Sequence, residues 1–195
     1  MNNNSFLLQI SKALALALIL GIGVSACGAG SQSWKEEVQL SDGKVIVIER
    51  ETIHSRGGGE WASNSSGSKP EERKVRFSSL DRAGGKPEWR STKKDSQTWP
   101  EKPLVLDVEA GQLIVISILS TSSACEIYSK YVHRNGVWVE EALPEKFEQR
   151  ETNLMIRDGT DIPKFVDLKT KYKENSTNGY RGSLKRVGPS RQVCS

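Results

Sequence analysis

Two histidines are the side chains that could most directly move a proton in this chain. His54 follows a predicted strand, and His133 stands beside an Asn-Gly turn. Histidine titrates near neutral pH and is the usual proton shuttle of enzymes. A serine triad would also need a positioned nucleophile, and the sequence has no Gly-x-Ser-x-Gly elbow to supply one. We therefore expect both histidines to be exposed or hydrogen-bonded surface residues.

Adjacent acids are the second group of side chains with catalytic potential, and they occur at 36–37, 71–72 and 140–141. Neighbouring residues of a strand point to opposite faces, so adjacency does not place two carboxylates across one substrate. The glycine run 57–59 lacks a following Lys-Ser or Lys-Thr, which favours a flexible turn over a phosphate loop. We assign no catalytic residue, cofactor or metal ligand. Distant acids or His54 could still form the site of a hydrolase of envelope polymer, which is the alternative to a protein without catalytic function.

The beginning of the chain has the pattern of an export signal. Lys12 and the amino terminus supply a positive start, and residues 13–24 carry no polar side chain. A helix of that length is too short for a hydrocarbon core, which needs about 20 residues. The alternative, a membrane-spanning helix extended back through Phe6, would place Lys12 inside the bilayer at a high cost in free energy.

Val24, Ser25, Ala26 and Cys27 end this apolar segment, and they resemble a bacterial lipobox. The resemblance implies a diacylglycerol thioether on Cys27, cleavage after residue 26 and, usually, acylation of the new amine. Two or three acyl chains hold a protein firmly in a bilayer. Gly28 stands where an aspartate would resemble an inner-membrane retention signal, which favours the outer membrane, facing the periplasm. We thus divide the chain into a signal peptide (1–26), a lipidated tether (27–33) and a domain (34–195).

Cys125 and Cys194 are the two cysteines left once Cys27 carries lipid. An even pair in an oxidising compartment most simply forms a disulfide. That disulfide would close a loop of about 70 residues and contribute up to roughly 4 kcal/mol of stability. Two free thiols or a metal pair are the alternatives, and two cysteines without a nearby histidine make a poor metal site. We predict the disulfide.

A basic stretch from Lys164 to Arg191 is the most pronounced charge feature of the chain, with eight basic and two acidic residues. Such a surface fits anionic envelope material such as lipid headgroups or lipopolysaccharide. The alternative is a solvated flank that balances the acidic residues of 140–151. The residues expected to contact a polyanion are Lys169, Lys171, Lys173, Arg181, Lys185 and Arg186. The formal net charge of the whole chain is only +4, which argues against a nucleic-acid-binding protein.

Apolar segments around three turn signals predict β-hairpins. They span 38–48 with an Asp-Gly turn, 104–119 with an Ala-Gly turn and 127–141 with an Asn-Gly turn. Residues 74–77 predict a further half-buried strand and 154–156 a shorter one. The composition, 36% hydrophobic and 27% charged, is that of a polar globular domain.

Other segments predict less regular structure. Residues 56–72 predict a mobile loop, and 81–102 an excursion packed by Trp89 and Trp99. Short helices are predicted over 144–151 and 161–173, each with a proline near its start. The fold class we predict is mainly β: a single antiparallel β-domain, sandwich or curved sheet, with one or two short helices.

Three patches of the predicted domain, 34–50, 125–130 and 138–147, are similar to a family of uncharacterised proteobacterial proteins, many of them predicted lipoproteins. The resemblance supports one domain and implies no activity. Together these features predict a lipid-anchored protein of the cell envelope without catalytic function, which binds an envelope protein or an anionic envelope polymer. A structural or phage-encoded surface protein is a further alternative, beside the hydrolase.

Overall fold

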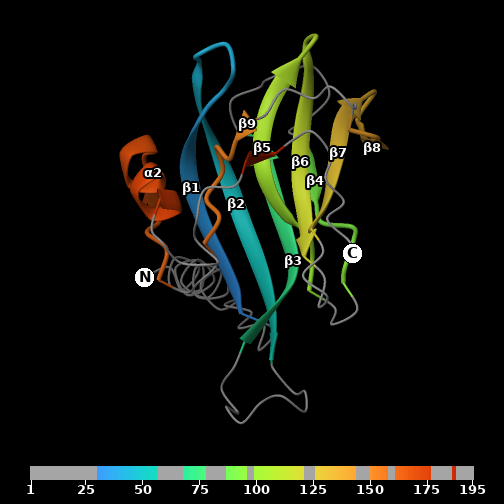
Figure 1. Ribbon diagram of the computed structural model, residues 1–195. Coiled ribbons are helices and arrows are strands. Elements are labelled where there is room, and N and C mark those ends of the chain that lie inside the picture. Colours follow the sequence, from blue (N-terminus) through green and yellow to red (C-terminus); the bar gives the residue numbers. More distant parts are fainter. Residues whose placement is uncertain are drawn as a thin grey trace, which may run out of the picture.

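The computed structural model describes residues 30–56, 68–77, 87–95, 99–120, 126–143, 150–157, 161–176 and 186–187. Two main β-sheets lie against each other, and a helix, α2 (Leu168–Ser176), lies beside the first strand (Figure 1). The predicted mainly β class is therefore confirmed. Within the described residues, no helix has the length and apolar character needed to cross a bilayer.

The first sheet has five strands in the order β10-β1-β2-β3-β4, and only the β10–β1 pair is parallel. The second sheet is antiparallel with the order β5-β6-β7-β8, and β9 pairs with β11 in a small third sheet. The strands are β1 (Ser31–Gln39), β2 (Val45–Arg56), β3 (Ser68–Phe77), β4 (Glu88–Arg90), β5 (Lys102–Glu109), β6 (Gln112–Ser120), β7 (Glu126–Arg134), β8 (Val137–Glu141), β9 (Arg150–Glu151), β10 (Phe165–Val166) and β11 (Arg186–Val187).

All three predicted hairpins are present, and two of them have two-residue turns with positive φ angles. Ala110 and Gly111 have φ values of 47° and 75°, and Asn135 and Gly136 have 50° and 84°. Two successive positive φ angles are the mark of a type I′ turn, whose twist matches that of the strands it joins. The turn residues thus fix the register of β5–β6 and β7–β8.

Both faces of β6 are buried, in two different apolar clusters. Leu113 and Val115 belong to the core that the two sheets share, whereas Ile114 and Ile116 belong to a second cluster with Ile156. Alternate residues of a strand point to opposite faces, so the second cluster lies on the face of this sheet away from the first sheet. A strand buried on both faces has a nearly continuous apolar sequence, as β6 has.

The segment 154–156 is not a strand, which corrects the prediction. Its three residues enter three different clusters: Leu154 the shared core, Ile156 the second cluster, and Met155 a third cluster with Trp34. A strand could direct its side chains to only two faces. The backbone instead bonds to side chains, because the Met155 N–H donates to Glu36 at 3.3 Å and the Ile156 N–H to Asn175 at 3.0 Å.

Residues 56–72 are not one loop, because β2 continues to Arg56 and β3 begins at Ser68. The described residues from Ser68 to Glu72 pair with β2, and Glu72 lies 3.4 Å from the buried Lys74. The middle of the predicted loop, 57–67, lies outside the described residues.

The two predicted helices also need correction. The second begins at Leu168, because residues 165–166 pair with β1 and the carboxylate of Asp167 accepts the Thr170 N–H at 2.6 Å as an N-cap. The first helix was predicted over 144–151. Its residues 144–149 lie outside the described residues, and residues 150–151 form β9.

The carboxylate of Glu101 connects the two sheets. It is 1% exposed and accepts bonds from the Thr92 N–H at 2.9 Å, the Ser117 hydroxyl at 2.6 Å and the Tyr131 hydroxyl at 2.9 Å. Thr92 follows β4 of the first sheet, while Ser117 and Tyr131 belong to β6 and β7 of the second. Buried carboxylates are tolerated only with such hydrogen bonds, so this residue fixes how the sheets meet.

We predict that Tyr131→Phe lowers the free energy of unfolding by about 2 kcal/mol, because the buried Glu101 carboxylate loses one of its donors. The matched control is Tyr128→Phe, which removes a hydroxyl bonded to Glu126 at 3.0 Å in a half-buried site and is expected to cost less. Urea unfolding followed by circular dichroism measures both. Equal losses in the two variants would contradict this role of Glu101.

Candidate functional site

The structure divides the predicted polyanion-binding residues into three groups. Lys169, Lys171 and Lys173 belong to α2. Arg186 belongs to β11, where its backbone pairs with Glu151. The remaining predicted residues lie outside the described part of the chain, as do the predicted lipidation and disulfide sites: Arg181, Lys185, Cys27, Cys125 and Cys194.

Helix α2 has one buried and one exposed face. Lys171 and Asn175, one turn apart, are buried at 4% and 2% exposure. Lys169, Tyr172 and Lys173 are exposed on the other side. The prediction was therefore wrong for Lys171, which cannot contact a polyanion from its buried position.

Lys171 belongs to a buried polar cluster that we name the Glu36 cluster. Its residues are Trp34, Glu36, Arg50 and Lys171. Alternation along β1 places Trp34 and Glu36 on the same face as the core residue Val38. Glu36 is fully buried, lies 3.2 Å from the Arg50 guanidinium and accepts the Trp34 indole N–H at 3.1 Å. Helix α2 and the segment before it thus cover a part of this face that the second sheet leaves uncovered.

The Glu36 cluster and its neighbours hold α2 in place. Lys171 donates from Nζ to the Glu37 carbonyl, and the Leu168 N–H donates to the Glu37 carboxylate at 3.1 Å. Asn175 donates to the Leu154 carbonyl at 2.9 Å. The pKa of Lys171 is lowered to about 8, chiefly by burial; Glu36 and Glu37 oppose this shift, and the positive charge of Arg50 adds to it.

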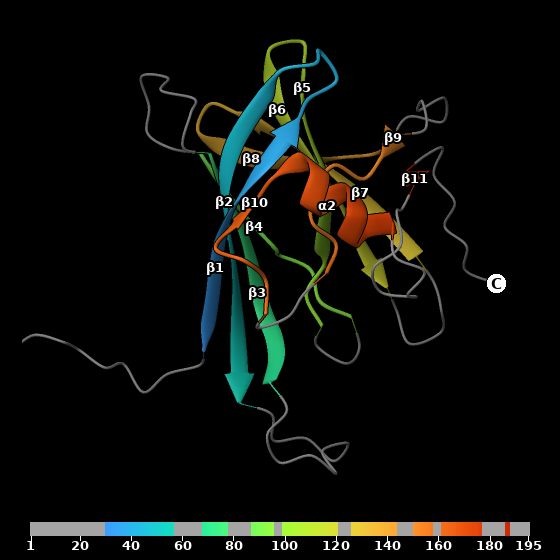
Figure 2. The same ribbon diagram turned by 90° about the vertical axis from the view of Figure 1, so that its left-hand side faces the viewer.

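The fixed helix presents an exposed surface of lysines and aromatic rings. We call it the α2 surface, and its residues are Lys164, Phe165, Lys169, Tyr172 and Lys173. Phe165 is 49% exposed and Tyr172 63% exposed. Figure 2 shows α2 and β10, which carry four of these residues, side by side on one side of the molecule.

The acids near the α2 surface are engaged by other groups. Asp161 and Glu174 both pair with Arg157, the latter at 2.7 Å, and Asp167 caps the helix. Of the acidic residues expected to balance the basic stretch, Glu140 pairs with Lys93 and Glu141 with Arg134 at 2.6 Å, whereas Glu151 of β9 lies opposite Arg186 of β11. Asp167 also lies close enough to Lys169 for the two charges to attract each other. The three lysines and this one acid leave the α2 surface with a net positive charge.

Of the two histidines, His54 is buried, contrary to the prediction of a surface position. His54 is only 7% exposed, and its backbone N–H donates to the Gly30 carbonyl at 2.9 Å. Its burial follows from its place on β2, because Thr52 and Arg50 on the same face are buried too. His133 is half-buried, with its ring centroid 5.0 Å from that of Trp138. Among the described residues, no three His, Cys, Asp or Glu side chains gather in a way that could hold a metal ion.

Sequence reasoning missed the buried acids Glu36 and Glu101. A signal for the first was present, because Glu36 stands at an inward position of the alternation Trp34-x-Glu36-x-Val38-x-Leu40. The partners of Glu101 are distant in sequence, up to 30 residues away, so no local pattern could indicate them.

Comparisons with models of protein families, with curated proteins and with solved structures find no match to this chain.

We predict that Lys171→Met removes a pH dependence of stability. The lysine has a lower pKa in the folded state than in the unfolded state, so above about pH 8 the folded protein has lost this proton while the unfolded chain still holds it. The free energy of unfolding therefore rises with pH in this range. From pH 8 to 9.5 the wild-type free energy of unfolding is expected to gain about 1 kcal/mol relative to Lys171→Met. Denaturant unfolding at both pH values measures this difference, and parallel pH profiles would contradict the assignment.

Proposed function

We propose that this chain is a lipid-anchored protein of the cell envelope that binds an anionic envelope polymer through the α2 surface, without catalysing a reaction. The observation that carries the proposal is the α2 surface itself, with three exposed lysines and two exposed aromatic rings. These residues lie on β10, on the residue before it and on α2, and Lys171 of the Glu36 cluster fixes α2. Two neighbouring acids, Asp161 and Glu174, pair with Arg157, and Asp167 caps the helix beside Lys169, so the surface keeps a net positive charge.

The chemistry of this surface suits a repeating anionic ligand. Each lysine near an anionic surface contributes about 1 kcal/mol, and several act together. An aromatic ring beside the lysines offers an apolar face to the sugar or acyl part of such a polymer. Because α2 is held by Lys171 and Asn175, its exposed side chains are presented without ordering a loop on binding.

The anchor part of the proposal rests on the lipobox-like residues that end at Cys27. The predicted tether of 27–33 needs correction, because residues 31–33 belong to β1. Gly30 already accepts the His54 N–H, and β1 begins at Ser31. A lipid on Cys27 would therefore be joined to the sheet through a segment of very few residues.

We predict salt-sensitive binding of the detergent-solubilised full chain to purified lipopolysaccharide. Lys169→Glu and Lys173→Glu are each expected to weaken binding at least about fivefold. Lys44→Glu is the matched control, since Lys44 is also an exposed lysine but lies in the β1–β2 turn. Co-sedimentation at several salt concentrations measures the affinities. Binding that ignores ionic strength, or equal losses in all three variants, would overturn the polymer proposal; a protein captured by crosslinking in cells would replace it with a protein partner.

We predict that Cys27→Ser abolishes acylation and releases the chain from bacterial membranes. Acyl chains supply about 0.8 kcal/mol for each buried methylene group, so their loss removes the anchor. Intact-mass measurement of the membrane fraction detects the lipid, and fractionation detects the release. A Cys27→Ser chain that still fractionates with membranes would refute the anchor.

A further inference from the structure

The end of the first sheet at which β2 ends and β3 begins is also the end at which β1 begins, four residues after Cys27 in the sequence. Ser31, the first residue of β1, pairs with Ile53, whereas Lys69 of β3 pairs with Ser55, two residues further along β2. Each strand residue advances about 3.4 Å, so Lys69 lies about 7 Å beyond Ser31 in the direction of the tether. The four residues from Cys27 to Ser31 span at most about 14 Å. Lys69 therefore lies within the reach of the tether.

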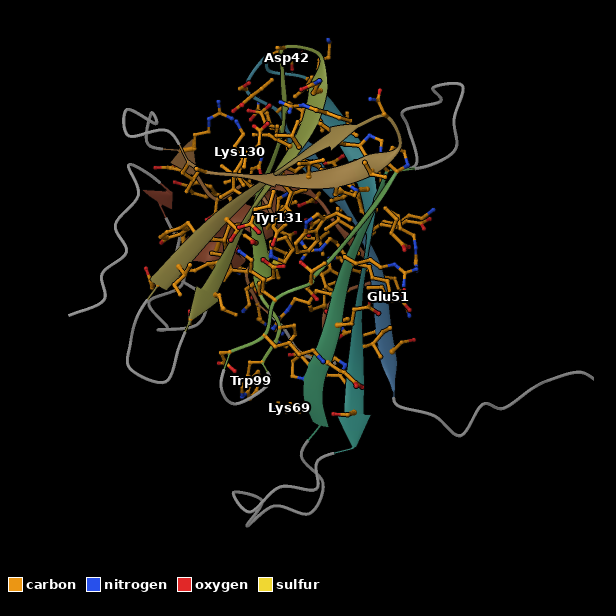
Figure 3. The ribbon with its side chains drawn as sticks, turned by 90° about the vertical axis from the view of Figure 1, so that its right-hand side faces the viewer. Asp42, Glu51, Lys69, Trp99, Lys130 and Tyr131 are labelled. Atoms are coloured by element: carbon orange, nitrogen blue, oxygen red, sulfur yellow. The ribbon has the colours of Figure 1, made fainter. Side chains whose placement is uncertain are left out.

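Trp99 stands beside Lys69 at this end (Figure 3). The Lys69 ammonium lies 5.7 Å from the centroid of the Trp99 ring, and the indole is 36% exposed. The prediction that Trp89 and Trp99 pack the segment 81–102 is thus only partly correct. Trp89 is buried at 1% exposure, but Trp99 reaches the surface. Within the described residues, Trp99 is among the few large hydrophobic side chains with an exposed surface.

The loop that carries Trp99 is closed and attached to the sheet. The Trp99 N–H donates to the Asp95 carboxylate at 2.8 Å, and the Asp95 N–H donates to the Trp99 carbonyl at 3.0 Å. Arg73 of β3, 3% exposed, donates to the carbonyls of Pro100 and Glu101. The ring is therefore held at the surface by the fold and does not reach it through a freely moving chain.

We propose that this end of the first sheet rests on the bilayer, with Trp99 in the headgroup region and Lys69 beside an anionic lipid; the inference rests on the proposed anchor at Cys27. Tryptophan favours the membrane interface, since its ring is apolar and its N–H is polar. A lysine beside it adds attraction to anionic headgroups and can extend its ammonium to the phosphate level. This contact orients the domain and leaves the α2 surface on a side of the molecule, free for its ligand.

The test uses the acylated full chain in vesicles of phosphatidylethanolamine and phosphatidylglycerol with brominated acyl chains, which quench only indoles at the bilayer. The difference in emission between wild type and Trp99→Phe isolates Trp99 from the other tryptophans. We expect this difference signal to lie at shorter wavelength than that of an exposed indole and to be reduced by the brominated lipid. Lys69→Glu is expected to diminish the quenching.

The matched control places an exposed indole at the opposite end of the sheet. Val45, the first residue of β2, is 48% exposed, so Val45→Trp in the Trp99→Phe background is expected to give a signal that brominated lipid leaves unchanged. Intact mass is measured on every sample. An acylated protein whose Trp99 signal is not quenched, or is quenched no more than that of Val45→Trp, overturns this inference alone; a chain without acyl mass overturns both the inference and the anchor.

Discussion

The buried carboxylate of Glu36 is the group on which the arrangement around α2 depends. It accepts bonds from Trp34 on its own strand and from the Met155 backbone, and it pairs with Arg50 on β2. A buried charge that loses its partner costs about 3–5 kcal/mol, so these groups must assemble together. Glu36 thereby holds the irregular segment at 154–156 against the first strand, and Asn175 of α2 in turn donates to the Leu154 carbonyl of that segment.

This arrangement separates two kinds of lysine on the same helix. Lys171 points inward and donates a hydrogen bond to the Glu37 carbonyl, while Lys169 and Lys173 are exposed to solvent. The inward lysine is fixed and so is the helix, and a fixed helix presents its outward charges at constant spacing. The buried cluster is therefore structural, yet it determines which charges an external ligand can meet.

Local sequence signals predicted the parts of the fold that local chemistry decides. Turn residues such as Asn135 and Gly136 determine their own φ angles, and the hairpins around them were correctly predicted. The segment 154–156 was misread as a strand because its apolar residues serve three clusters built from distant elements. Lys171 was predicted to be exposed because it is charged. It is buried because the Glu37 carbonyl accepts its hydrogen bond and the buried Glu36 carboxylate attracts its charge, and both groups are distant in sequence. Neither could be seen in one stretch of sequence.

The parallel pairing of β10 with β1 places residues 165–166 beside the first strand in one sheet. The contact between Lys171 and Glu37 spans 134 residues, and that between Met155 and Glu36 spans 119. Contacts so distant in sequence require the closure of long loops before they stabilise anything, which slows folding. A chain that emerges amino terminus first must therefore wait for its last third before β1 can pair with β10 and before Glu36 can accept the Met155 N–H.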